Sequence, residues 1–239
     1  MKIIYSTDIG RMRSENQDAV WCAQQDDTYG LAVVCDGMGG ANGGRQASSM
    51  VVETIKRMVE TEPFDGSDIR SFFQNMIDTS NRLVYEAAEE DNLLAGMGTT
   101  LVMAFVNDKK AYFANVGDSR GYYITNGSIS QITKDHSAVQ ELVDSGHLTE
   151  RQAKKHPNKN IITRAIGIEP NISFDYYEVP IKSGDIIILC SDGLTNYLDE
   201  NEIQFEAFGG DFNSLPQRMI DLANNRGGSD NITVAAIQL

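Results

Sequence analysis

Two apolar runs, each followed by an Asp-Gly pair, constrain this chain more than any other feature. The first run, 31–35 (LAVVC), leads into Asp36, Gly37 and a glycine-dense turn, and the second, 186–190 (IIILC), leads into Ser191, Asp192 and Gly193. Short apolar runs rich in branched residues predict buried strands. An acid at the end of a buried strand is costly unless a cation or a hydrogen-bond donor lies opposite it. The runs therefore predict two carboxylates that converge on one metal site.

The chain has 239 residues, of which 41% are hydrophobic and 23% are charged, a composition typical of a globular protein with a sizeable core. A layered, β-rich fold of this length can be one domain, so we expect residues 1–239 to form a single domain. The net charge of −14 argues against a sequence-independent nucleic-acid binder and against a binder of anionic membranes.

Three cysteines, Cys22, Cys35 and Cys190, lie in or beside apolar runs, and no C-x-x-C pair occurs. We interpret them as reduced core residues of a cytosolic protein. The N-terminal segment 1–8 is too polar for a signal peptide, and no run approaches the ~18 apolar residues that a membrane helix needs. The sequence therefore predicts a soluble, cytoplasmic protein without a membrane anchor.

Helical spacing of apolar residues predicts amphipathic helices over 47–59 and over 69–87, the second entered at Ser67 or Asp68, and a later helix over 213–225. Apolar runs and alternating patterns predict strands over 2–7, 19–24, 29–35, 98–106, 110–116, 121–125, 128–133, 172–179, 185–190 and 231–238. Strands, then two helices, then more strands do not alternate as βαβ units would. This order favours antiparallel sheets with helices packed outside them.

A polar insert at about 137–165 lies between groups of strands and is expected to form a mobile flap. The pattern predicts two short helices within 137–155, broken at Ser145-Gly146. The linker 156–160 then leads to the apolar segment 161–166.

Five acids share one local context, since each starts or follows a predicted strand: Asp18, Asp36, Asp118, Asp192 and Asp230. A single Asp-Gly pair is more often a simple turn. Several such acids, two of them after nearly continuous apolar runs, favour a metal site instead. An oxygen-rich site suits Mn²⁺ or Mg²⁺, and three histidines without H-x-x-x-H spacing match zinc poorly.

Other catalytic groups find no support in the sequence. Neither Cys35 nor Cys190 has the arginine that a C-x5-R thiol phosphatase requires, and no G-x-S-x-G elbow occurs. The glycines after Asp36 match neither a Walker loop nor a G-x-G-x-x-G motif. A metal-activated water remains, because two cations ~3.5–4 Å apart can share one hydroxide and hold a phosphoryl group.

At these residues the chain resembles a bacterial member of the metal-dependent protein phosphatase family (PPM, protein phosphatase 2C-like). The matching motifs follow one another over nearly the whole chain: Asp8-Ile9-Gly10, Arg13 with Asn16-Gln17-Asp18, Asp36-Gly37-Met38-Gly39-Gly40 with Gly44 and Ala47-Ser48, Gly98-Thr99-Thr100, Asn115-Val116-Gly117-Asp118-Ser119-Arg120, Asp135-His136-Ser137, His156-Pro157 with 162–167 (ITRAIG), Ser191-Asp192-Gly193-Leu194, and Asp230-Asn231-Ile232-Thr233. The resemblance implies an α+β fold, a four-layer αββα sandwich of two antiparallel sheets flanked by helix pairs.

The resemblance also implies ligands for two core ions, Mn²⁺ or Mg²⁺. Asp36 would bridge both ions, the backbone carbonyl of Gly37 would bind one of them, and Asp192 and Asp230 would complete the other. Asp18 would act mostly through metal-bound water.

Substrate binding and proton transfer are implied in the same way. Arg13 would hold the substrate phosphate, a role that its forked guanidinium suits. Asp118 matches the position that binds a third ion in bacterial members, and Asn160 of the flap is a further candidate ligand there. Met38 stands where many eukaryotic members carry a His proposed as general acid, which leaves a metal-bound water as the candidate donor.

The implied reaction is hydrolysis of phosphoserine or phosphothreonine on proteins, with Arg13, Asp36, Asp192 and Asp230 as catalytic residues. A bridging hydroxide would attack phosphorus in line while Arg13 and the metals stabilise the charge. The implied partners are phosphoproteins, namely substrates of a bacterial Ser/Thr kinase and the kinase itself, in signalling by a monomer. Two alternatives stay open: a catalytically inactive metal-binding scaffold, and a specialised phosphatase of anti-sigma-factor antagonists.

Overall fold

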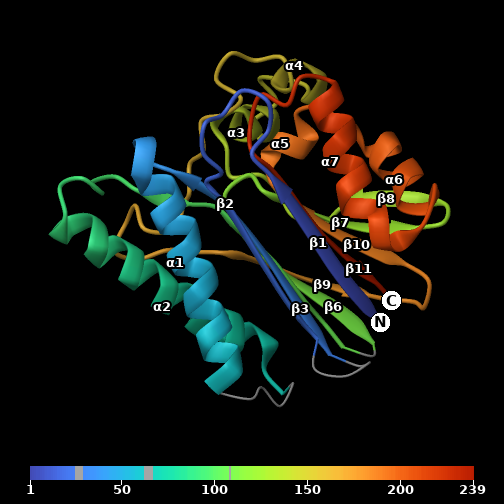
Figure 1. Cartoon of the computed structure of the whole chain (residues 1–239), viewed down its shortest axis with the longest axis horizontal. Coiled ribbons are helices and arrows are strands. Elements are labelled where there is room, and N and C mark those ends of the chain that lie inside the picture. Colours follow the sequence, from blue (N-terminus) through green and yellow to red (C-terminus); the bar gives the residue numbers. More distant parts are fainter. Residues whose placement is uncertain (25–28, 62–66, 108) are drawn as a thin grey trace.

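The computed structural model describes residues 1–24, 29–61, 67–107 and 109–239. Two antiparallel β-sheets pack against each other, and helices cover the outer face of each sheet (Figure 1). The predicted four-layer αββα sandwich is therefore confirmed. Among the described residues, none of the helices combines the length and the apolarity that crossing a bilayer requires.

The first sheet joins the two ends of the chain. Its strands lie in the order β1 (Lys2–Asp8), β11 (Ile232–Gln238), β10 (Ile186–Cys190), β7 (Arg120–Thr125) and β8 (Ser128–Gln131). Because β1 pairs with β11, the two termini lie side by side (Figure 1). Its outer face packs on α5 (Asp192–Thr195), α6 (Glu200–Phe208), the 3-10 helix η1 (Phe212–Ser214) and α7 (Leu215–Asn225).

The second sheet carries the two long helices. Its strands lie in the order β2 (Asp18–Gln24), β3 (Gly30–Met38), β5 (Leu101–Val106), β6 (Lys110–Val116) and β9 (Asp175–Pro180), and the two-residue strand β4 (Gly98–Thr99) pairs with the end of β3. Helices α1 (Gly40–Thr61) and α2 (Ile69–Glu90) lie together over the outer face of this sheet (Figure 1).

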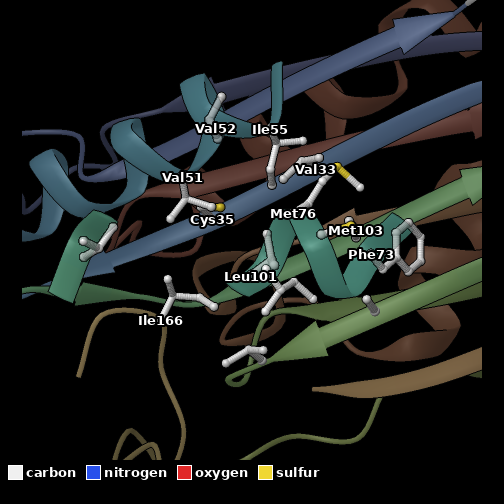
Figure 2. Packing of buried hydrophobic residues seen from close by; sticks show 14 of the residues in the cluster. Val33, Cys35, Val51, Val52, Ile55, Phe73, Met76, Leu101, Met103 and Ile166 are labelled. Atoms are coloured by element: carbon white, nitrogen blue, oxygen red, sulfur yellow. The ribbon is translucent and has the colours of Figure 1, made fainter. Parts of the chain in front are cut away.

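Strand β3 is buried on both faces, which explains why its sequence is apolar without alternation. Val33 and Cys35 point toward the two long helices and pack on residues such as Ile55 (Figure 2). The alternate residues Ala32 and Val34 belong to the cluster between the two sheets. Full burial of a branched or aromatic side chain contributes roughly 1.5–3 kcal/mol, so this strand is firmly held on both sides.

The prediction that Asp36 ends its strand is wrong. Strand β3 continues through Gly37 and Met38, because these two residues pair with Thr99 and Gly98 of β4. The glycine-dense turn is also shorter than predicted. It is confined to Gly39 and Gly40, whose φ angles are +124° and +77°, and α1 begins at Gly40. Asp36 is therefore fixed within a paired strand rather than carried on a loop.

Two other differences concern the chain after β10. The sequence analysis did not predict α5 or α6, so Asp192 opens a short helix instead of a simple turn. The helix predicted over 213–225 is instead a 3-10 turn followed by α7. The remaining strand differences are shifts at strand ends and an interruption at Thr100, between β4 and β5.

The insert at about 137–165 contains the two predicted short helices, α3 (Ala138–Asp144) and α4 (Glu150–Ala153). Ser137 and Thr149 cap them by accepting hydrogen bonds from backbone N–H groups of the first turns. The segment 161–166 contains no regular strand. It touches the rest of the fold through isolated bridges, which pair Thr99 with Ile166 and Ser137 with Ile162.

Candidate active site

The predicted site residues meet at one cavity of about 500 Å³. Its wall includes four of the five predicted acids, and it also includes Gly37, Arg13 of the β1–β2 loop and Asn160 of the insert. Asp18 is not among the residues that line this cavity, and one of its carboxyl oxygens, Oδ1, is buried. The structure thus brings together segments that lie as far apart in the chain as Arg13 and Asp230.

Asp36 is held by the backbone around it. Its N–H donates to Thr100 Oγ1 at 2.9 Å, and its carbonyl oxygen accepts from Thr100 N and from Thr99 Oγ1, both at 2.9 Å. Burial raises the pKa of Asp36 well above its ordinary value, and the negative charges of Asp18 and Asp192 raise it further. The carboxylate therefore needs positive charge nearby in order to ionise at neutral pH.

Gly37 occupies a position that admits no side chain. A Cβ built on it would lie 2.1 Å from the carbonyl oxygen of Gly44 in α1 and 2.6 Å from that of Gln17. The Gly37 N–H donates to the same Gln17 carbonyl at 3.2 Å. The end of β3 therefore packs closely between the first turns of α1 and the loop that leads into β2, with no room for a side chain at Gly37.

Asp18 lies at the start of β2 with its two carboxyl oxygens in different situations. Oδ2 accepts a hydrogen bond from Ser191 Oγ at 2.7 Å, while the buried Oδ1 has no hydrogen-bond partner. Ser191 Oγ in turn accepts from Thr233 N at 3.0 Å, which ties β10 to β11. Burial raises the pKa of Asp18 to about 7, although hydrogen bonds from Thr233 and Ser191 partly offset that effect.

The two carboxyl oxygens of Asp192 also differ in their hydrogen bonding. Its Oδ2 accepts from Asn196 Nδ2 at 3.2 Å, and its buried Oδ1 has no partner. Burial raises the pKa of Asp192, and the charge of Asp230 adds to that rise. Burial, followed by the charge of Asp192, raises the pKa of Asp118 to about 8. Four partly buried acids, Asp18, Asp36, Asp118 and Asp192, thus have a raised pKa.

Arg13 contacts Asp230, the remaining predicted acid at this cavity. Its Nη2 lies 2.8 Å from Asp230 Oδ2, and its side chain is 49% exposed. The guanidinium therefore reaches from the loop over the acids while most of its donors stay available. A half-exposed arginine beside a cavity is well suited to bind a doubly charged phosphate.

The donor set fits a hard divalent cation. Asp18 Oδ1 and Asp192 Oδ1 are buried oxygens without a partner, and burial of such atoms is costly unless a cation compensates. Within the described part of the chain, no three His, Cys, Asp or Glu side chains are gathered closely enough to cage one ion by themselves. Mg²⁺ commonly binds through one or two carboxylates and keeps several waters, so it does not require such a cage.

The insert contributes to the cavity through Asn160 and Ile162. Next to Asn160, Lys159 donates a hydrogen bond from Nζ to the side-chain oxygen of Asn196, the residue that also bonds Asp192. His136 and His156 line no part of the cavity. His136 Nδ1 accepts from Gly117 N at 3.1 Å, and His156 Nδ1 accepts from Asn158 N at 3.2 Å, so each ring holds a backbone N–H group.

The sequence analysis did not assign roles to several residues that hold the site. Thr100, Ser191 and Asn231 each hydrogen-bond to a site residue or to the loop that carries one. All three lie inside motifs that carried the family resemblance. Their roles depend on contacts between residues more than 60 positions apart in the sequence, such as Thr100 and Asp36, which are 64 positions apart. No local sequence pattern predicts such contacts.

Comparisons with known proteins indicate the same family as the sequence motifs. The family model for protein phosphatase 2C matches residues 11–233. The chain is 38% identical over 239 residues to a serine/threonine phosphatase stp of Listeria welshimeri, covering 98% of this chain and 94% of the relative. The chain belongs to the protein phosphatase 2C family.

Solved structures agree with this assignment. A serine/threonine phosphatase of S. agalactiae superposes with a TM-score of 0.92 at 39% identity, covering 100% of this chain and 99% of the other. The catalytic domain of the phosphatase PstP, described as a complex with two manganese ions, gives a TM-score of 0.87 at 30% identity, covering 98% of this chain and 96% of the other.

These findings confirm the predicted family, the fold and the enzyme class, a metal-dependent protein serine/threonine phosphatase that acts on phosphoproteins. They do not favour the inactive scaffold or the specialised phosphatase of anti-sigma-factor antagonists.

Proposed function

We propose that residues 1–239 act as one phosphatase domain whose catalytic residues are Arg13, Asp36, Asp192 and Asp230. The observation that carries this proposal is the convergence of buried acids with raised pKa values on one cavity, with a half-exposed arginine at its wall. Such an arrangement is unfavourable for folding alone, and it matches what binding of cations and a phosphate requires.

The acids and one carbonyl would hold the ions. We assign Asp36, Asp192, Asp230 and the carbonyl of Gly37 to two core ions, with Asp18 acting through water because it is not among the residues that line the cavity. Asp118 and Asn160 face the same cavity and are assigned to a third ion. Oxygen ligands alone favour Mn²⁺ or Mg²⁺ over softer metals.

Each side chain then has a distinct task. Bound divalent cations supply Lewis acidity and activate a water molecule for in-line attack on phosphorus. The Arg13 guanidinium binds two phosphoryl oxygens and stabilises the charge that grows on them. Met38 lines the cavity and has no proton to transfer, so the general acid for the leaving alkoxide is not this side chain.

The substrates are proposed to be phosphoserine and phosphothreonine proteins of a signalling system in the cytoplasm, with a bacterial Ser/Thr kinase and its targets as partners and the phosphatase acting as a monomer. The acidic surface supports protein substrates over nucleic acids, since a net charge of −14 repels polyanions.

The test is release of phosphate from a phosphothreonine peptide with Mn²⁺, with Mg²⁺ and with EDTA. We expect metal-dependent release that chelation abolishes and that Asp192→Ala lowers by about 10³-fold or more, because the substitution removes a metal ligand. The matched control is Asp78→Ala, which removes an exposed acid on α2 that accepts a hydrogen bond from Gln74. Equal activity of both variants would disprove the role of Asp192. No release by folded wild-type protein in any metal would disprove the proposed activity.

A further inference from the structure

Asn231 uses its whole side-chain amide to hold the loop between β1 and β2. Its Nδ2 donates to the carbonyl oxygens of Ile9 and Glu15, both at 2.9 Å. Its Oδ1 accepts from the N–H of Gln17 at 2.8 Å. The side chain is nearly buried, at 5% exposed, so these three hydrogen bonds satisfy an amide that has little access to water.

The three hydrogen bonds of Asn231 hold the loop on both sides of Arg13. Ile9 lies before Arg13, and Glu15 and Gln17 lie after it, so the amide clamps the two arms of the loop together. The backbone adds to this, because Arg11 N donates to Gly228 O at 2.7 Å. The loop is therefore built on the segment that precedes β11.

Arg13 is the functional residue at the tip of this clamped loop. Its guanidinium ends at Asp230 Oδ2, 2.8 Å away, and Asp230 is the residue directly before Asn231. Two consecutive residues thus act on the arginine: Asn231 holds the loop backbone on either side of it, and Asp230 pairs with its guanidinium. A long side chain on an unheld loop would lose much of its binding to rotamer and loop entropy.

We propose that Asn231 is a positioning residue for phosphate binding, because it fixes the loop that presents Arg13 to the catalytic cavity. The inference rests on the proposed role of Arg13 as the phosphate ligand. Asn231 does not need to touch the phosphate. Its contribution is to keep the guanidinium ready at the cavity wall before substrate arrives.

A matched control exists elsewhere in the fold. Asn81 of α2 is also nearly buried, and its amide also holds a loop by three backbone groups. It donates to the carbonyls of Glu169, at 2.9 Å, and Pro170, at 3.3 Å, and it accepts from Gly167 N at 2.8 Å. None of these residues lines the catalytic cavity. Asn81→Ala should therefore lower the stability of the fold as Asn231→Ala does, without weakening phosphate binding.

The experiment compares Asn231→Ala with Asn81→Ala in the Mn²⁺-loaded protein. Inorganic phosphate is the probe, used as a competitive inhibitor of aryl phosphate hydrolysis. We expect the inhibition constant of phosphate to rise about ten-fold in Asn231→Ala and to stay within about two-fold in Asn81→Ala. KM should rise more than kcat falls. Mn²⁺ binding, measured by calorimetry, should change by less than about three-fold in both variants.

A double-mutant cycle separates positioning from general damage. Arg13→Ala should raise the inhibition constant about ten-fold, and Arg13→Ala with Asn231→Ala should match that single variant within about two-fold instead of reaching about 100-fold. Hydrogen exchange gives a readout that is independent of activity. Exchange of the segment 9–17 should increase in Asn231→Ala and stay unchanged in Asn81→Ala.

If Asn231→Ala does not fold, Asn231→Ser and Asn81→Ser take their place, since a hydroxyl can replace one of the three bonds. The inference would be overturned if the two substitutions had independent, multiplicative effects on the inhibition constant of phosphate. It would also be overturned if Mn²⁺ affinity fell as much as phosphate affinity. Either result would leave the proposed role of Arg13 unchanged. An inhibition constant unchanged in Arg13→Ala would overturn the proposed role of Arg13 and this inference with it.

Discussion

Asp18 of β2 and Asp36 of β3 are direct partners in the antiparallel register of the two strands. Both residues are partly buried, burial raises the pKa of each, and the negative charge of Asp18 raises the pKa of Asp36 further. Like charges directly opposite each other on neighbouring strands destabilise a sheet. This pair therefore marks a place where stability has been given up for a site that binds cations.

Removal of one of these charges should stabilise the metal-free protein. At pH 8 in EDTA, we expect Asp36→Asn to raise the free energy of unfolding by about 1–2 kcal/mol, because it removes a carboxyl group that the folded, metal-free protein can ionise only at a free-energy cost. For a chain of this length, the midpoint of thermal unfolding should rise by about 2–4 °C per kcal/mol. The same variant should lose the stabilisation that Mn²⁺ gives to the wild type. Scanning calorimetry with and without Mn²⁺ measures both effects, and a lower midpoint for Asp36→Asn in EDTA would contradict the explanation.

The raised pKa values also predict how stability depends on pH. Asp18 titrates at about 7 and Asp118 at about 8 in the folded protein, against an ordinary value of 3.8. Between these values the folded state holds more protons than the unfolded state, so stability falls as pH rises. Each extra proton held by the folded state contributes about 1.4 kcal/mol per pH unit.

Urea unfolding in EDTA between pH 4 and pH 8 measures this slope. Below about pH 4 the acids are protonated in both states, so their contribution to stability is fully present there. Mn²⁺ should remove most of the slope, because a bound cation favours the ionised carboxylates. Stability that increases from pH 5 to pH 8 in EDTA would show that these acids ionise normally in the fold.

Among the glycines that line the cavity, Gly37 leaves the least room for a side chain. We expect Gly37→Ala to cost about 3 kcal/mol, because its Cβ would lie 2.1 Å from the Gly44 carbonyl oxygen and must displace α1 or β3. The control is Gly127→Ala, where no atom lies within 4 Å of the added Cβ, and it should change stability by less than about 0.5 kcal/mol. Chemical denaturation of both variants in EDTA separates this steric effect from any effect on metal binding. Similar losses for the two variants would argue against the close approach.

His136 should tolerate one amide replacement better than the other. Because Gly117 N–H donates to Nδ1, the ring is neutral with its proton on Nε2, 3.3 Å from Asp175 Oδ2. Burial lowers the pKa of His136, which keeps it neutral at pH 7. Asn can place an oxygen where Nδ1 lies, so His136→Asn should cost about 1 kcal/mol. His136→Gln cannot do this and should cost about 2–3 kcal/mol, since it leaves a buried N–H unpaired. If urea unfolding gave equal losses of stability for His136→Asn and His136→Gln, the hydrogen bond from Gly117 would not be the reason for the loss.

The predictions from sequence succeeded where a pattern is local and failed where a partner is distant. The apolar runs before Asp36 and Asp192 predicted their buried strands, because strands buried on both faces lack alternation. The extension of β3 through Gly37 was not predictable, since it depends on a two-residue pairing with β4. Helix α6 was missed although Asp199 and Glu202 form a capping box, because the helix is short and its apolar residues do not gather on one face: Ile203 and Ala207 are buried, whereas Phe205 and Phe208 are exposed.

The same distinction applies to the site. Strand ends and motifs indicated the acids, but they did not indicate which residues support them. Ser191 reaches Asp18 across 173 positions, and Asn231 reaches Glu15 across 216. Such partners are set by the sheet order, which the sequence pattern does not contain. The assignment of ligands to individual ions stays a prediction.

Pairing of β1 with β11 has a consequence for the time at which activity arises during synthesis. A ribosome releases β1 first and β11 last, and the register joins Lys2 to Gln238. Until that last segment emerges, β1 lacks its neighbour, and the loop that carries Arg13 lacks Asn231. Contacts between such distant positions form late, because the chain between them must be ordered first. The newly made polypeptide therefore cannot complete the loop that presents Arg13 until the segment containing Asn231 and β11 has been translated.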